Sequence, residues 1–514
     1  MSIAVSAPHR HDEDPSAPRP LIARGLPLWW MILLLAVPAW CQQMLHTAVR
    51  VSDRLIAGRF LTLAPAEEAA MRLQAMGVAG QYLPTDFAAC LVPLHTVTQM
   101  QHLVARPVEY QAAQTTASYI DWFITSCSVL ISAGATALVA RFIGAGDRSL
   151  AVRVAHQALL LAVLLGSLGS LAGLWGARDV MELLQLQGEA AHYAADYLRP
   201  LLCVLPLQII VIVGIACMAG AGDTLAGMTV LIGVVGINIP LAWAFSQGWG
   251  PFPRLGFIGI SVGTAMSECL AAVVVLTMLW RGRAGLKLQW RLFRPDTDLL
   301  RRLLRISVPA GVDSISLILC QLWFLSIVNR LGSTAGAAHG IALQWEALGY
   351  QAGAAFATAA MTLTGQYLGA GRPDLARRSV WATFGLGCGI MSAFGVLFYL
   401  LAEPLFLIFC PHPEQRPIVE AGVPVLRLIA FAMPAVAVWL VFLATLRGAG
   451  DTRLPVLITW TGMLGIRIPL AYWFTGPLGW GLLGAWWAMV TDLHVRAVAY
   501  ILRFLSGKWQ RIQV

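Results

Sequence analysis

The sequence predicts an all-α polytopic membrane protein with twelve transmembrane helices in two six-helix lobes related by a parallel internal repeat. Three observations lead to this fold class. Of 514 residues, 58% are hydrophobic and 12% are charged, the mean hydropathy is +0.71, and motifs of the first half recur in the second. Soluble domains carry about 25% charged residues. One soluble core cannot hide so much apolar surface, so lipid is the expected solvent.

Each predicted span is a run long enough to cross a bilayer, which takes about 20 mostly apolar residues. Twelve runs qualify: 27–56, 115–140, 154–176, 197–219, 227–247, 257–280, 306–330, 342–366, 379–402, 422–446, 454–475 and 482–504. Arg and Lys gather in the loops on one side, as in loops that stay in the cytoplasm. We therefore expect a multi-pass protein of the cell membrane, of the bacterial inner-membrane type, with both termini cytoplasmic.

The spans divide the chain into five regions. We expect a disordered cytoplasmic tail over 1–26, an N-terminal lobe over 27–280, a cytoplasmic linker over 281–305, a C-terminal lobe over 306–504 and a cytoplasmic tail over 505–514. The net charge of +9 does not indicate nucleic-acid binding, because the basic residues lie in short loops between apolar runs. The expected partners are the lipid bilayer and a small organic solute, and the protein is expected to be a monomer.

The internal repeat is read from three matched segments. Gly-Ala-Gly-Asp-Thr at 220–224 recurs at 448–452, an offset of 228; Gly-Ala-Gly at 144–146 recurs at 369–371, an offset of 225; and Val-Pro-Ala at 37–39 recurs at 308–310, an offset of 271. Six spans per unit is an even number, so the two units enter the membrane from the same side.

The change in offset locates an insertion. The first half holds 46 extra residues (271 − 225) between its first two spans. We expect an extracytoplasmic helical insertion over 61–113, because a loop of this length without structure is uncommon. A loose loop is the alternative.

The motifs together resemble the multidrug and toxic compound extrusion (MATE) family. The likeness rests on Pro38 with Asp53 fifteen residues later, and on the segments 143–147, 219–224 and 337–342. It implies two six-helix lobes around a central cavity and export of mostly cationic organic compounds, driven by entry of H⁺ or Na⁺. It also implies that Pro38 kinks the first helix and that Asp53 is the cation-coupling acid. No cofactor besides the coupling ion, and no metal site, is expected.

Ionisable residues inside the spans are the other candidates, because each costs about 2.5–3.5 kcal/mol at membrane depth. Asp121 and Glu346 are 225 residues apart, which is the repeat offset, so the second and eighth spans place carboxylates at equivalent depth. We expect them to bind a cation or relay protons. The alternatives are burial against arginines such as Arg467 and, for Asp53, a local pair with Arg50 three residues before it.

Two departures from the family pattern leave the coupling ion open. Asn238 fits the family's first-lobe site, but the Asp that commonly follows four residues later is Ala242 here. The repeat equivalent of Asn238 is Arg467, and another family position for an acid is Leu317. Asp53, Asp121, Asn238, Glu346 and Arg467 are therefore our candidate cation-coupling or substrate-binding residues.

The last span of each lobe also carries an acid. Glu268 and Asp492 are almost equivalent by the repeat. Asp492 lies four residues before Arg496, which predicts a structural ion pair on one helix face.

The favoured function is a cation-coupled secondary antiporter working by alternating access, and not an enzyme. A flippase for lipid-linked polyanionic precursors is the alternative; it would need an arginine-lined cavity, to which Arg467 alone points. An intramembrane enzyme is disfavoured because the sequence has no clustered nucleophile or metal constellation. A channel is disfavoured by the two-lobed repeat.

Overall fold

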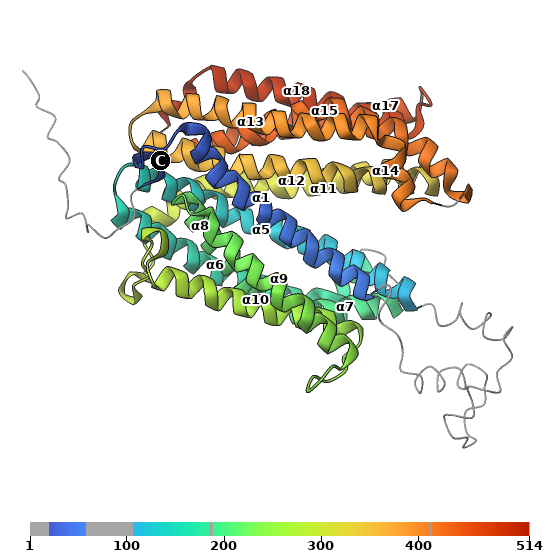
Figure 1. Ribbon diagram of the computed structural model, residues 1–514, viewed down its shortest axis with the longest axis horizontal. Coiled ribbons are helices and arrows are strands. Elements are labelled where there is room, and N and C mark those ends of the chain that lie inside the picture. Colours follow the sequence, from blue (N-terminus) through green and yellow to red (C-terminus); the bar gives the residue numbers. More distant parts are fainter. Residues whose placement is uncertain (1–19, 58–105, 184–188, 412, 513–514) are drawn as a thin grey trace, which may run out of the picture.

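The computed structural model describes residues 20–57, 106–183, 189–411 and 413–512, and the regular secondary structure of these ranges is helical (Figure 1). The helices of the first half are α1 (Leu28–Leu55), α5 (Arg106–Gly144), α6 (Arg148–Leu183), α7 (Glu189–Cys203), α8 (Leu205–Gly220), α9 (Thr224–Gln247) and α10 (Phe257–Trp280). Those of the second half are α11 (Thr297–Asn329), α12 (Ser333–Gly369), α13 (Pro373–Leu400), α14 (Ala402–Phe409), α15 (Arg416–Ala449), α16 (Arg453–Gly462), α17 (Ile468–Thr475) and α18 (Gly481–Leu505).

These helices supply the twelve expected spans. Within the described ranges, nine helical segments are long and apolar enough to cross a membrane, one of them α16 with α17, and the bent pair α7 and α8 makes a tenth. The remaining two are α12, with 37 residues, and α18, with 25 residues, which are long enough but carry more polar side chains. The predicted all-α, two-lobed fold is confirmed.

The fourth span differs from the single helix predicted over 197–219. It is broken at Val204, and the two helices around this residue meet at 57°. Pro206 occupies the first turn of α8. Proline has no N–H to donate and disfavours helical geometry in the residue before it, so the break lies where the sequence places it.

The first helix belongs to both lobes. Its early residues, Ile32 and Leu35, are buried in a cluster formed mostly by α12, α13, α15 and α18 of the C-terminal lobe. Beyond its end, Ile56 is buried in the core of the N-terminal lobe. Figure 1 shows α1 running diagonally between the two groups of helices, and Pro38 lies within it.

Four glycine-containing turns gather at one end of the molecule, which we call the Gly-turn end. They are the turns at 144–146, 220–222, 369–371 and 448–450, and the last glycine of each has a positive φ between 69° and 95°. Residues with a Cβ rarely adopt this conformation, which explains why glycine recurs there. The two lobes converge at this end and diverge toward the other (Figure 1).

Hydrogen bonds join the lobes at the Gly-turn end. Thr362 and Gln366 of α12 donate to the carbonyls of Ala219 and Gly220 at 3.0 and 3.1 Å. Arg141 of α5 donates to the carbonyl of Ala449 at 3.3 Å. These bonds tie the ends of helices from opposite lobes to one another.

The ends of α5 and α12 also cross backbone to backbone. A Cβ at Gly144 would lie 2.0 Å from the Gln366 carbonyl oxygen, and a Cβ at Gly369 would lie 1.9 Å from the Arg141 carbonyl oxygen. The two glycines are repeat equivalents. The motifs therefore serve close packing of the lobes as well as turning of the chain.

The structure adds detail at four of the expected regions. Residues 1–19 and 58–105 lie outside the described residues, but 106–113, assigned to the insertion, form the start of α5, with Pro107 in its first turn. Residues 20–26, assigned to a disordered tail, include Leu21, which is buried at 2% exposure in an apolar cluster. The end of the expected linker, 281–305, overlaps α11, which begins at Thr297. Asp296 caps this helix by accepting hydrogen bonds from backbone N–H groups of its first turn. The last region, 505–514, buries Trp509 against Phe504, with ring centroids 5.1 Å apart.

Candidate functional site

Asp53 lies in the last turn of α1 and is 6% exposed. Its Oδ1 atom has no hydrogen-bond partner among the described residues. The hydroxyl of Thr264, on α10, lies beside the carboxyl group. Arg50 and Asp53, both described by the structure, do not form the local ion pair that was the alternative for Asp53. Asp53 is therefore a buried acid that Arg50 does not neutralise.

Asn238 of α9 continues the polar contacts toward α10. Its Nδ2 donates to Thr264 Oγ1 at 3.0 Å and to Ser267 Oγ at 3.2 Å, while its Oδ1 is buried and receives no bond from a described residue. Asp53 and Asn238 thus each leave one buried acceptor oxygen without a donor. Such atoms carry a desolvation cost unless a donor or a cation reaches them.

Asp121 of α5 lies in the same lobe. Its Oδ1 accepts a hydrogen bond from Gln208 Nε2, on α8, at 3.2 Å. Glu268 of α10 lies close enough to interact electrostatically with Asp121, and Asp121 also interacts electrostatically with Arg50. Both carboxylates are partly buried.

The N-terminal lobe therefore gathers three acids. Asp53, Asp121 and Glu268 come from α1, α5 and α10, and in the described part of the chain none of them forms a salt bridge. We call these residues the N-lobe acid cluster. A carboxylate withdrawn from water without a fixed counter-charge is stabilised by taking up a proton or another cation.

The corresponding region of the C-terminal lobe is internally paired. Arg467, in the π-helical segment Met463–Arg467 between α16 and α17, donates to Asp492 Oδ2 from Nε at 2.9 Å and to Gln321 Oε1 at 3.0 Å. Arg496 donates to both oxygens of Asp492 at 2.8 and 2.9 Å. The predicted pair of Asp492 with Arg496 is confirmed, and Arg467 joins it.

Two further acids of this lobe also have basic neighbours. Glu346 of α12 is partly buried and interacts electrostatically with Arg467. Asp313 of α11 accepts from Arg447 of α15 at 2.6 Å. We call Asp313, Glu346, Asp492, Arg447, Arg467 and Arg496 the C-lobe charge network. Its three acids and three arginines balance, in contrast to the N-lobe acid cluster.

The predicted residues therefore fall into two groups. Asp53, Asn238 and Asp121 lie among N-terminal-lobe neighbours, while Glu346 and Arg467 lie together in the C-terminal lobe. Of the alternatives considered for Asp121 and Glu346, proximity to Arg467 holds for Glu346. Sequence reasoning did not select Glu268, and it missed Thr264; the spacing of these two residues, four apart in one helix, was the available signal.

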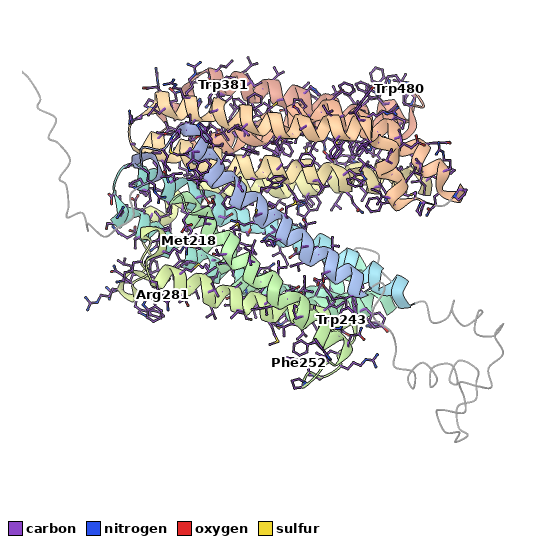
Figure 2. The ribbon with its side chains drawn as sticks, viewed as in Figure 1. Met218, Trp243, Phe252, Arg281, Trp381 and Trp480 are labelled. Atoms are coloured by element: carbon purple, nitrogen blue, oxygen red, sulfur yellow. The ribbon has the colours of Figure 1, made fainter. Side chains whose placement is uncertain are left out.

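Figure 2 shows the side chains of both lobes. Trp243, on α9, lies at the end of the N-terminal lobe away from the Gly-turn end, and Trp480, just before α18, lies at the same end of the C-terminal lobe. Arg281, the first residue of the linker, lies at the opposite end. Tryptophan at helix ends is typical of membrane–water interfaces.

The chain is similar to one protein family and to several known proteins. A family model described as MatE matches residues 87–244 and 309–473. A probable multidrug resistance protein NorM of Thermotoga maritima is 29% identical over 398 residues, covering 76% of this chain and 84% of that protein. A probable multidrug resistance protein YoeA of Bacillus subtilis is 24% identical over 440 residues, covering 82% and 92%.

Solved structures show the same fold at low identity. A MOP superfamily transporter from Pyrococcus furiosus superimposes with a TM-score of 0.81 at 19% identity, covering 97% of this chain and 100% of that one. A multidrug resistance MATE family transporter in an outward-facing conformation gives a TM-score of 0.80 at 18% identity, with the same coverage.

Proposed function

Because the chain belongs to the multidrug and toxic compound extrusion (MATE) family of multidrug efflux transporters, we propose that it is a cation-coupled antiporter that exports organic cations. It works by alternating access of its two lobes, with H⁺ or Na⁺ as the coupling ion. The Gly-turn end faces the cytoplasm, together with both termini. The conformation described here is the outward-facing state, since hydrogen bonds close the lobes at the Gly-turn end.

The contrast between the two lobes carries this proposal. The N-lobe acid cluster has an excess of negative charge, and Asp53 and its neighbour Asn238 each have a buried acceptor oxygen without a donor among the described residues. The C-lobe charge network has one such oxygen, on Asp313, but its three acids are matched by three arginines. A bound cation is therefore stabilised more strongly in the N-terminal lobe than in the C-terminal lobe. We assign coupling to Asp53, Asp121 and Glu268, with Asn238 as an oxygen ligand.

The remaining predicted residues take a different role. Glu346 has Arg467 as a fixed neighbour, so we assign it to orientation of the substrate and not to coupling. Arg467 donates hydrogen bonds to Asp492 and Gln321 and is 2% exposed. This favours the antiporter over a flippase for polyanionic lipid precursors, which needs arginines that are free to meet an anion.

Reconstitution tests the proposal directly. Proteoliposomes loaded with a fluorescent organic cation receive an imposed proton or sodium gradient, and efflux is followed for wild type, Asp121→Asn, Glu268→Gln and Asp53→Asn. We expect gradient-driven flux that each of these neutralising changes reduces. Glu420→Gln, at a surface acid of α15 with 67% side-chain exposure, is the matched control and should keep wild-type flux.

Two results would contradict the proposal at different levels. If a broad panel of organic cations gave no gradient-dependent flux, the antiport reaction would be wrong. If flux occurred but was unchanged in all three N-lobe variants, the assignment of coupling to the N-lobe acid cluster would be wrong.

A further inference from the structure

The backbone hydrogen bonding of α1 is interrupted at Pro38. Proline has no N–H, so the carbonyl four residues earlier, that of Leu34, loses its helical partner. Thr224 supplies a replacement: its Oγ1 donates to the Leu34 carbonyl at 3.1 Å. Thr224 is the first residue of α9 and is 2% exposed. The interruption in α1 is therefore satisfied from a different helix.

A second hydrogen bond joins Thr224 to α1 on the other side of the proline. Gln42, four residues after Pro38, donates from Nε2 to the backbone carbonyl of Thr224 at 2.8 Å. Gly227 leaves room for this side chain, because a Cβ there would lie 2.5 Å from Gln42 Nε2. Thr224 thus holds α1 one turn before and one turn after its interruption.

Thr224 is itself held firmly by the N-terminal lobe. The preceding residue, Asp223, caps α9 by accepting from the Ala226 N–H at 3.0 Å, and it accepts from Arg283 Nε at 2.8 Å. The two bonds from Thr224 to α1 therefore reach a fixed point of the N-terminal lobe.

The position of this contact matters because the beginning of α1 packs in the core of the C-terminal lobe and the chain just after its end packs in the core of the N-terminal lobe. Ile32 and Leu35 are buried with the C-terminal lobe, whereas Ile56 is buried with the N-terminal lobe. A change in the relative position of the lobes must be absorbed between these anchors. Pro38 is the point in that interval where the helix has the fewest internal bonds.

We propose that Thr224 is a positioning residue of the transport cycle, whose hydroxyl and backbone carbonyl hold α1 on both sides of Pro38 and release it when the lobes exchange access. This inference rests on the proposed alternating-access function. It assigns the Thr of the Gly-Ala-Gly-Asp-Thr motif to control of a neighbouring helix. The repeat equivalent, Thr452, is 3% exposed and provides a matched control in the other lobe.

Hydrogen–deuterium exchange of the full-length protein in nanodiscs tests the contact without a substrate. Thr224→Val removes the hydroxyl and keeps the branched shape. We expect exchange in the α1 peptide around Pro38 to rise by about 5- to 150-fold, the range for a buried group left without its partner. Thr224→Ser should restore wild-type exchange, and Thr452→Val should leave that peptide unchanged.

Transport provides the functional readout, and Gly227→Ala provides an independent variant. We expect reduced flux in Thr224→Val and in Gly227→Ala, which displaces Gln42 but leaves Thr224 intact, with wild-type flux in Thr224→Ser. Unchanged α1 exchange in Thr224→Val would overturn the proposal, as would an equal rise in Thr452→Val or no rescue by serine. Absence of flux from the wild-type protein would instead overturn the proposed function, whereas wild-type flux that Thr224→Val does not alter overturns the role of Thr224 alone.

Discussion

Replacing Asp492 with Asn should be strongly destabilising, because this carboxylate is the shared partner of two buried arginines. It receives Arg467 Nε at 2.9 Å and Arg496 Nε at 2.8 Å, and none of the three residues is more than 2% exposed. Hydrogen bonds to charged groups are worth about 1.5–3 kcal/mol each, and breaking a buried ion pair costs about 3–5 kcal/mol. We expect Asp492→Asn to lower the free energy of unfolding by about 3–5 kcal/mol.

The assay is reversible unfolding in mixed micelles, followed by circular dichroism. The matched control is Asp298→Asn, since Asp298 pairs with Arg302 on the surface with side-chain exposures of 67% and 43%, and such pairs contribute about 0–1 kcal/mol. The double variant Asp492→Asn with Arg467→Gln removes one charge of each sign and should regain part of the loss. If Asp492→Asn cost no more than the surface control, the buried network would not hold this lobe together.

Three further outcomes are expected. Gly369→Ala would place a Cβ 1.9 Å from the Arg141 carbonyl oxygen, so it should lower the free energy of unfolding by about 1–3 kcal/mol, measured by the same titration. Glu268→Gln should weaken the dependence of efflux on the imposed cation gradient without lowering the unfolding midpoint, measured in parallel on one preparation. Trp509→Ala should expose the core beneath the last helix and cost about 3–5 kcal/mol, because Trp509 is fully buried against Phe504; a midpoint equal to wild type would contradict this.

The spans were predictable because a bilayer sets a length and a composition that each must meet. The twelve apolar runs reappear as helices, and the four glycine turns lie where the repeat matched them. The break at Val204 was not predicted, because mean hydropathy over a window does not detect the effect of Pro206. This proline changes the helix geometry but hardly changes the hydropathy of the span.

The sequence nominated candidate residues where the repeat or a motif pointed to them, and not where contacts cross between helices. Asp121 and Glu346 were found by their common offset. Arg467 was selected as a candidate without its partner Asp492, because Asp492 lies 25 residues away on the next span. Glu268 was not selected as a candidate residue, because its assignment depends on its proximity to Asp121 of α5, a helix distant in the chain.

The pairing of Arg467 with Asp492 also has a consequence for how the chain enters the membrane during synthesis. Each of these charges costs about 2.5–3.5 kcal/mol at the centre of an isolated spanning helix. The two helices that carry them are joined by the short segment 476–480, so their charges can meet before either faces lipid. We expect the last two spans to leave the translocon together as a hairpin. A chain that ends before α18 would leave Arg467 without Asp492, and we expect membrane quality control to degrade such a truncated protein.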